Sequence, residues 1–132
     1  MEAIVLNENK LYNLLKENLI PDLKQTDQFN PADAISSKYN LSIELKCRSN
    51  HYSTFLIEKK KYDNLILNSK CRYIVSTPLG IFSFNLKKIK EPVWFDQWLP
   101  DTYHFHKPEL TLKQVGYLDI NQSKNITSQL IK

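Results

Sequence analysis

Cysteine is scarce in this chain, and long hydrophobic runs are absent from it. The two cysteines, Cys47 and Cys71, are far apart and form no CxxC spacing, so neither a disulfide framework nor a thiolate zinc site is indicated. No apolar run approaches the roughly 20 residues of a membrane helix, and the N-terminus lacks the basic-then-apolar order of a secretory signal. We therefore expect a cytoplasmic protein with reduced cysteines and no membrane association.

Internal repeats and low-complexity segments are also absent, and a chain of 132 residues has room for one domain. Hydrophobic residues make up 42% and charged residues 24%, values close to those of folded soluble proteins, which argues against a disordered or fibrous chain. The net charge of +4 suits a polyanionic partner, although it also serves ordinary solubility. Its distribution says more, because residues 38–72 hold eight Lys or Arg against three Asp or Glu.

The hydrophobic pattern predicts an α/β domain that begins with an amphipathic helix. Apolar side chains recur at helical spacing over residues 4–20, and Pro21 ends the run. Glu8 falls within the apolar stripe of this helix, whereas Glu17 points to its polar side. Alternating segments then predict strands at 32–36 and 41–48, which a turn at 37–40 joins into an antiparallel hairpin.

Further along, the pattern predicts a third strand at 52–57, a helix at 58–69 and a second hairpin formed by 71–77 and 81–86. The expected order is helix, three strands, helix, two strands, with a central mixed sheet flanked by helices. Beyond residue 90, prolines interrupt any long element. We expect residues 1–90 to form the core and residues 91–132 to form a C-terminal appendage, packed on that core through Trp94, Phe95 and Trp98.

Three ionisable side chains are expected to converge on the first hairpin. Glu44 and Lys46 lie two residues apart on a strand and leave the same face of the sheet, and Asp33 on the neighbouring strand projects beside them. Two adjacent carboxylates repel each other unless a cation lies between them, and hard oxygen ligands suit Mg²⁺ or Mn²⁺. Such a metal binds a phosphate oxygen and activates a water molecule, which the lysine orients or deprotonates. The pattern indicates phosphodiester hydrolysis.

The series Asp33-x10-Glu44-Leu45-Lys46 resembles the PD-(D/E)xK, or restriction-endonuclease-like, nuclease superfamily. The segments IELKCRSN, STFLIEKKKYDNLI and RYIVSTPLGIFSFNL are most similar to Holliday-junction resolvases, and the resemblance covers residues 6–86. It implies a Mg²⁺- or Mn²⁺-dependent deoxyribonuclease that acts on branched DNA as a homodimer without an organic cofactor. The bias toward Asn, Lys and Ile suggests an AT-rich, viral genome, so a phage origin is a further expectation.

The resemblance also implies a role for each residue of the motif. The metal ligands would be Asp33, Glu44 and the backbone carbonyl of Leu45, and the catalytic lysine would be Lys46. The extra acid that the superfamily often carries on its first helix would be Glu8, with Glu17 as a competitor. The chain departs from the motif at one point, because its proline stands one position early, at residue 31.

Basic residues close to the motif are candidates for contacts with nucleic-acid phosphates: Arg48, Lys59, Lys60 and Lys61. The three lysines start the predicted second helix, where positive charge is unfavourable to the helix dipole. Phosphate contact would explain their presence, and the alternative is a solvated charged turn.

Each of these residues also has a purely structural interpretation. Asp33 suits a cap for backbone N–H groups, Glu44 with Lys46 suits a solvent-facing polar edge, and Glu8 suits the positive end of a helix dipole. His104 and His106 lack a third metal ligand at a suitable spacing, so surface positions are expected. The alternatives to a nuclease are a non-catalytic nucleic-acid-binding module with the same fold and a structural or interaction protein.

Overall fold

The computed structural model describes residues 3–27, 30, 32–68, 70–100 and 110–131. Its helices are α1 (Glu8–Asn18), α2 (Lys59–Leu65), α3 (Thr127–Leu130) and a 3-10 turn, η1 (Ile120–Gln122). Its strands are β1 (Lys24–Gln25), β2 (Ala34–Ser36), β3 (Leu41–Cys47), β4 (Thr54–Glu58), β5 (Lys70–Thr77), β6 (Gly80–Phe84), β7 (Phe95–Pro100), β8 (Leu110–Asp119) and β9 (Lys124–Asn125). No helix in these ranges is long and apolar enough to cross a membrane.

Two sheets organise the fold. The larger one has six strands in the order β1-β2-β3-β5-β6-β9, and the smaller one has three in the order β4-β8-β7. β3 and β5 are parallel, and every other neighbouring pair is antiparallel. The protein is therefore a mixed α/β fold with a mixed central sheet and few helices, as the sequence pattern predicted.

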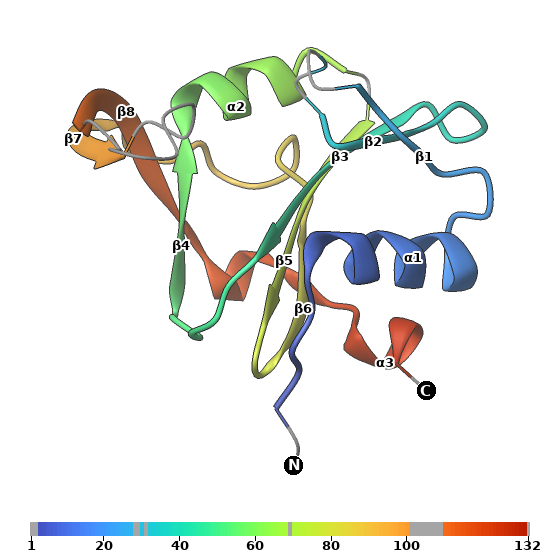
Figure 1. Cartoon of the computed structure of the whole chain (residues 1–132). Coiled ribbons are helices and arrows are strands. Elements are labelled where there is room, and N and C mark those ends of the chain that lie inside the picture. Colours follow the sequence, from blue (N-terminus) through green and yellow to red (C-terminus); the bar gives the residue numbers. More distant parts are fainter. Residues whose placement is uncertain (1–2, 28–29, 31, 69, 101–109, 132) are drawn as a thin grey trace.

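The elements form layers around the larger sheet. Helix α1 covers one face, with α3 beside it, whereas α2 and the smaller sheet lie on the opposite side (Figure 1). Leu11 and Leu15 of α1 are buried against this sheet with Ile43, Leu45 and Ile74. Because apolar side chains alternate with polar ones along β3, one strand can face α1 on one side and the site on the other.

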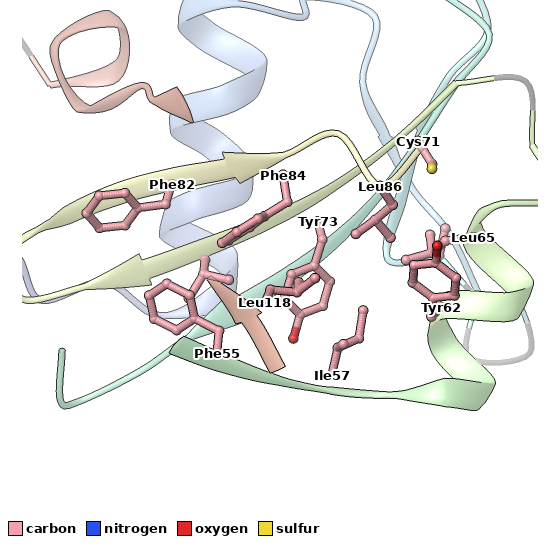
Figure 2. Close-up of a cluster of buried hydrophobic side chains, with 12 residues drawn as sticks. Phe55, Ile57, Tyr62, Leu65, Cys71, Tyr73, Phe82, Phe84, Leu86 and Leu118 are labelled. Atoms are coloured by element: carbon pink, nitrogen blue, oxygen red, sulfur yellow. The ribbon is translucent and has the colours of Figure 1, made fainter. Parts of the chain in front are cut away.

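A second apolar cluster fills the space between the two sheets and α2. Figure 2 shows aromatic rings from both sheets packed together, with Phe55 of β4 facing Phe84 of β6 at a ring-centroid distance of 5.9 Å. Tyr62 and Leu65 anchor α2 in the same cluster. Burying these side chains fixes the height and rotation of α2 above the central sheet.

Helix α1 begins later than the sequence pattern predicted. The Asn7 side chain accepts a hydrogen bond from the backbone N–H of Lys10 at 2.8 Å, so Asn7 is the N-cap and the helix starts at Glu8. Leu19, expected on the buried stripe, lies beyond the helix end and is 37% exposed. Glu8 consequently stands in the first turn, at the end of α1 that carries its free N–H groups.

The predicted order of elements needs correction between the two helices. Four strands lie there instead of three, because a two-residue strand, β1, pairs with β2. The strand predicted at 52–57 exists as β4, but it belongs to the smaller sheet and pairs with β8. Its partner lies about sixty positions later in the chain, which a local pattern of alternation cannot reveal. Both predicted hairpins are present, as β2–β3 and β5–β6.

Residues 110–131 contribute to both sheets, since β8 pairs with β4 and β9 pairs with β6. Trp94 packs against the cluster between the sheets, and its ring meets Tyr62 edge-on at 5.2 Å. Trp98, which was also expected to pack on the core, is 60% exposed, and Phe95 is 38% exposed. Trp94 is therefore the main aromatic anchor of this part of the chain.

Candidate active site

Asp33 lies at the point where β2 begins, and it is held by β3. Its backbone N–H donates to the carbonyl of Ile43 at 2.9 Å, and its Oδ2 accepts from the backbone N–H of Leu45 at 2.8 Å. The side chain of Asp33 thus continues the β2–β3 ladder for one more hydrogen bond. This interaction fixes the carboxylate beside the middle of β3, next to the residues on either side of Leu45.

The backbone carbonyl of Leu45 faces the same side as its N–H. In a strand, the N–H and C=O of one residue point toward the same neighbouring strand. The N–H of Leu45 meets Asp33, and β2 begins only at Ala34, opposite Ile43, so the carbonyl points past the start of β2. An oxygen ligand from the main chain is therefore available at the edge of the sheet where Asp33 lies.

Glu44 is buried, with 1% of its surface exposed, and is aligned with Tyr73 on the parallel strand β5. Its Oε1 accepts a hydrogen bond from the Lys61 ammonium at 2.6 Å, whereas its Oε2 is buried and has no hydrogen-bond partner in the described part of the chain. The interpretation of Glu44 as a solvent-facing residue is therefore wrong. A buried carboxylate oxygen without a hydrogen bond destabilises the fold, and the described side chains supply no partner for this atom.

The environment of Glu44 raises its pKa from 4.5 to about 7. Burial is the main cause, and the negative charge of Asp33 adds to it, whereas the hydrogen bond and charge of Lys61 and the charge of Lys46 oppose it. The group is therefore poised to lose its proton close to neutral pH. A cation placed between Glu44 and Asp33 would favour the ionised form.

Lys46 leaves β3 on the same face as Glu44, two residues further along, and is partly buried. Burial raises the pKa of both Glu44 and Glu8, and the positive charge of Lys46 opposes this rise in each case. The ammonium group thus lies within electrostatic reach of the two acids. The structure brings Lys46 to the cluster that the sequence pattern outlined.

Glu8 is the acid of α1 that reaches Asp33. Partial burial of its carboxyl group raises its pKa, the negative charge of Asp33 raises it further, and a side-chain hydrogen bond with Asp33 acts in the same direction. Lys46 and Lys61 lower it. Glu8 is itself largely exposed, so its predicted place on the buried stripe was wrong, and Glu17 is exposed near the other end of the helix. Of the two acids considered from sequence, Glu8 is therefore the one that the fold places at Asp33.

The four basic candidates have different surroundings. Lys59 makes an ion pair with Asp63 on the same helix at 2.7 Å, and Lys61 makes its pair with Glu44. Lys60, between them, is exposed. Arg48 is also exposed, and its guanidinium hydrogen-bonds to the hydroxyl of buried Tyr73.

The contact of Lys61 with a carboxylate of the motif was not predicted from the sequence. The lysine was assigned to phosphate, on the argument that three cations at a helix start need a separate reason. The local pattern could not show which of the three lysines turns toward the sheet. The position of α2 above β3 decides it.

The donor set fits a hard divalent cation that keeps part of its water shell. Within the described ranges, no three His, Cys, Asp or Glu side chains come together as a closed metal cage. Mg²⁺ commonly binds through one or two carboxylates and completes its octahedron with water and substrate phosphate. Asp33 and Glu44 would supply the carboxylates for such an ion, Glu44 through its unpartnered Oε2, and Leu45 would supply a main-chain oxygen. His104 and His106 lie outside the described residues.

Comparison with known proteins gives one kind of match. No family model matches the chain, and no curated protein matches it. Among solved structures, the chain is similar to Hjc of Archaeoglobus fulgidus, a Holliday junction resolvase from an archaeal hyperthermophile. The two share 13% sequence identity over 91% of each chain, with a TM-score of 0.56. At this identity the likeness is one of fold.

Proposed function

We propose that the protein is a divalent-metal-dependent deoxyribonuclease that cuts branched DNA. The observation that carries the proposal is the hydrogen bond of Asp33 to the Leu45 N–H next to Glu44, whose Oε2 is buried without a partner among the described residues, with Lys46 on the same face of β3 as Glu44. The fold adds support, since a Holliday junction resolvase has a similar one over nearly the whole chain. The fold alone does not assign the activity, so the argument rests on the site.

Asp33, Glu44 and the Leu45 carbonyl would hold Mg²⁺ or Mn²⁺. Such an ion supplies Lewis-acid stabilisation of a phosphate oxygen and lowers the pKa of a bound water. Lys46 would orient the attacking water by donating a hydrogen bond from Nζ. Glu8, which reaches Asp33 from α1, would position or assist this water from the opposite side of the aspartate.

The fold likeness and the charge near the site support the proposed substrate class. Arg48, directly after β3, and Lys60, on α2, are exposed, and Lys59 lies next to Lys60. These cations would contact DNA phosphates on either side of the scissile bond. Branched DNA is proposed because the structural neighbour is a Holliday junction resolvase.

We also propose that the active form is a homodimer. A four-way junction presents two equivalent strands for symmetrical cleavage, and one copy of this chain carries one candidate site. A twofold pair of chains would supply two. Light scattering on the purified protein, with and without a four-way junction, tests this part, and a monomer bound singly to the junction would contradict it.

The test of the function is direct cleavage. A labelled four-way junction, a linear duplex of the same sequence and a supercoiled plasmid are incubated with the protein and Mg²⁺, Mn²⁺ or a chelator. We expect cleavage of the junction with either metal, none with chelator, and none with Lys46→Met. Binding of the junction without cleavage under any of these metals would instead favour a non-catalytic nucleic-acid-binding module.

A further inference from the structure

Lys61 contacts the most buried acid of the candidate site from outside the motif. Its Nζ lies 2.6 Å from Oε1 of Glu44, and the two residues come from different elements, α2 and β3. The Lys61 side chain is 35% exposed, whereas that of Glu44 is 1% exposed. The lysine therefore reaches from the protein surface to a buried carboxylate, and Glu44 has little room to turn away from it.

The two oxygens of Glu44 are used differently. Oε1 accepts from Lys61, whereas Oε2 is buried without a hydrogen-bond partner in the described part of the chain. A carboxylate held at one oxygen has a fixed rotamer, so its second oxygen has a fixed direction. Ligating carboxylates in metal sites are commonly held in this way by a neighbouring donor, and that donor sets the direction of the metal-binding oxygen.

The neighbours of Lys61 on α2 do not share this geometry. Lys59 is paired with Asp63, and Lys60 is exposed. The helix itself is fixed by Tyr62 and Leu65, both buried in the cluster between the sheets (Figure 2). The lysine at position 61 is therefore held above Glu44 by the packing of its own helix.

We infer that Lys61 is a positioning residue for the metal: it holds Oε1 of Glu44 so that Oε2 is presented to the divalent ion. This inference rests on the proposed function, because it assumes that Glu44 binds the ion. Lys61 acts through Glu44 and does not itself touch the phosphate or the attacking water. Removing it frees the carboxylate to rotate and leaves both of its buried oxygens without a donor.

The experiment measures Mn²⁺ affinity by calorimetry, with no DNA present. Lys61→Met is expected to weaken Mn²⁺ binding by about 10- to 100-fold, the usual cost of losing a donor to a metal ligand. Lys61→Arg keeps a charged donor and is expected to stay within a few-fold of the wild type. Lys70→Met, which removes an exposed lysine at the start of β5, is the matched control and should bind Mn²⁺ as the wild type does.

Folding is checked by thermal melts in chelator, and affinities are measured well below the lowest midpoint. If Lys61→Met does not fold, Lys61→Gln replaces it, with an expected loss of at least about fivefold, since it keeps a neutral donor only. Wild-type Mn²⁺ affinity in Lys61→Met, or in Lys61→Gln where that variant replaces it, overturns the inference. Tighter binding also overturns it, because Lys61 would then compete with the metal.

The outcomes also separate the inference from the proposed function. A wild-type protein that cleaves DNA with Mn²⁺ while Lys61→Met keeps full Mn²⁺ affinity overturns the inference alone. A wild-type protein that neither binds Mn²⁺ nor cleaves DNA overturns the proposed function, and the positioning role of Lys61 with it.

Discussion

The Oδ2 of Asp33 accepts a hydrogen bond from the backbone N–H of Leu45 at 2.8 Å, and so a carboxylate takes the place of a main-chain acceptor at the start of β2. The same residue thereby closes the ladder and supplies negative charge to the site. The structural role of Asp33 and its proposed catalytic role fall on one side chain, and the choice of substitution decides which of them is tested.

Asp33→Asn keeps an oxygen that can accept from Leu45 but removes the charge. We expect the metal-free protein to melt within about 2 °C of the wild type, a stability difference well under 1 kcal/mol. Cleavage is expected to fall by about 100-fold or more, because metal binding loses an anionic ligand. Melting curves and junction cleavage are the measurements, and wild-type cleavage by the variant would contradict the assignment.

Asp33→Ala removes the hydrogen bond as well. Its loss should lower the free energy of unfolding by about 1 kcal/mol relative to Asp33→Asn. Urea unfolding in chelator measures the difference between the two variants. Equal stability of the Asn and Ala variants would show that the contact with Leu45 contributes nothing to the fold.

Lys46→Met is expected to separate metal binding from catalysis. Because the lysine acts on the attacking water, cleavage should fall by about 10²- to 10⁴-fold while Mn²⁺ affinity stays within a few-fold of the wild type. Lys38→Met, in the exposed turn between β2 and β3, is the control and should cleave normally. A variant at position 46 that cleaves at the wild-type rate would exclude the catalytic role.

The raised pKa of Glu44 predicts how stability depends on pH without metal. Since the folded-state pKa is about 7 and the ordinary value is 4.5, the folded protein binds this proton more tightly than the unfolded chain does. The contribution of Glu44 to stability is therefore present at low pH and is lost as the pH rises through this window. Glu44→Gln should exceed the wild type by on the order of 2 kcal/mol above the window and should lose the advantage below it.

Urea unfolding of both proteins in chelator, from acid to mildly alkaline pH, measures this difference. The pKa of about 7 already includes the attraction to Lys61, which stabilises the ionised form and opposes the rise caused by burial. A difference between Glu44→Gln and the wild type that does not change with pH would refute the assignment of a raised pKa.

Glu8 and Glu17 form a matched pair on one helix. Glu8→Gln removes a charge next to Asp33 and is expected to lower the cleavage rate by about 10-fold or more, a loss of at least about 1.4 kcal/mol of transition-state stabilisation. Glu17→Gln, exposed on the same helix, should leave the rate unchanged. If Glu17→Gln lowered the cleavage rate and Glu8→Gln did not, Glu17 would be the additional acid of the site.

DNA binding is best measured in the Asp33→Asn background, where cleavage does not interfere. Lys60→Ala and Arg48→Ala are each expected to weaken junction binding and to reduce the slope of log affinity against log salt concentration by about one. Lys124→Ala, on β9 at the far edge of the larger sheet, is the control. Fluorescence anisotropy over a series of salt concentrations measures both quantities.

Local patterns were sufficient for the first hairpin and for the shared face of Glu44 and Lys46. Alternation along β3 is strong because α1 covers one face, and the turn residues at 37–40 fix the hairpin. Asp33 was correctly placed beside the pair, although the contact through Leu45 depends on where β2 begins. That boundary is set by hydrogen bonding and not by hydrophobicity.

Contacts between distant segments could not be read in this way. The pairing of β4 with β8 joins segments about sixty residues apart. The contact of Lys61 with Glu44 depends on how α2 packs against the sheet. The choice between Glu8 and Glu17 likewise required the N-cap at Asn7, which fixes the start of α1. In each case the outcome depended on packing between elements or on helix capping, which the hydrophobic pattern does not show.

The pairing of β4 with β8 has a consequence for the order in which the protein is made. The ribosome must synthesise the chain to Asp119 before β4 can find its partner, so the segment leading into α2 lacks its sheet until then. During translation, the carboxylates of the first hairpin would exist without the lysine poised above them. A chain still emerging from the ribosome would therefore hold the acids of the proposed site before Lys61 had been brought to them.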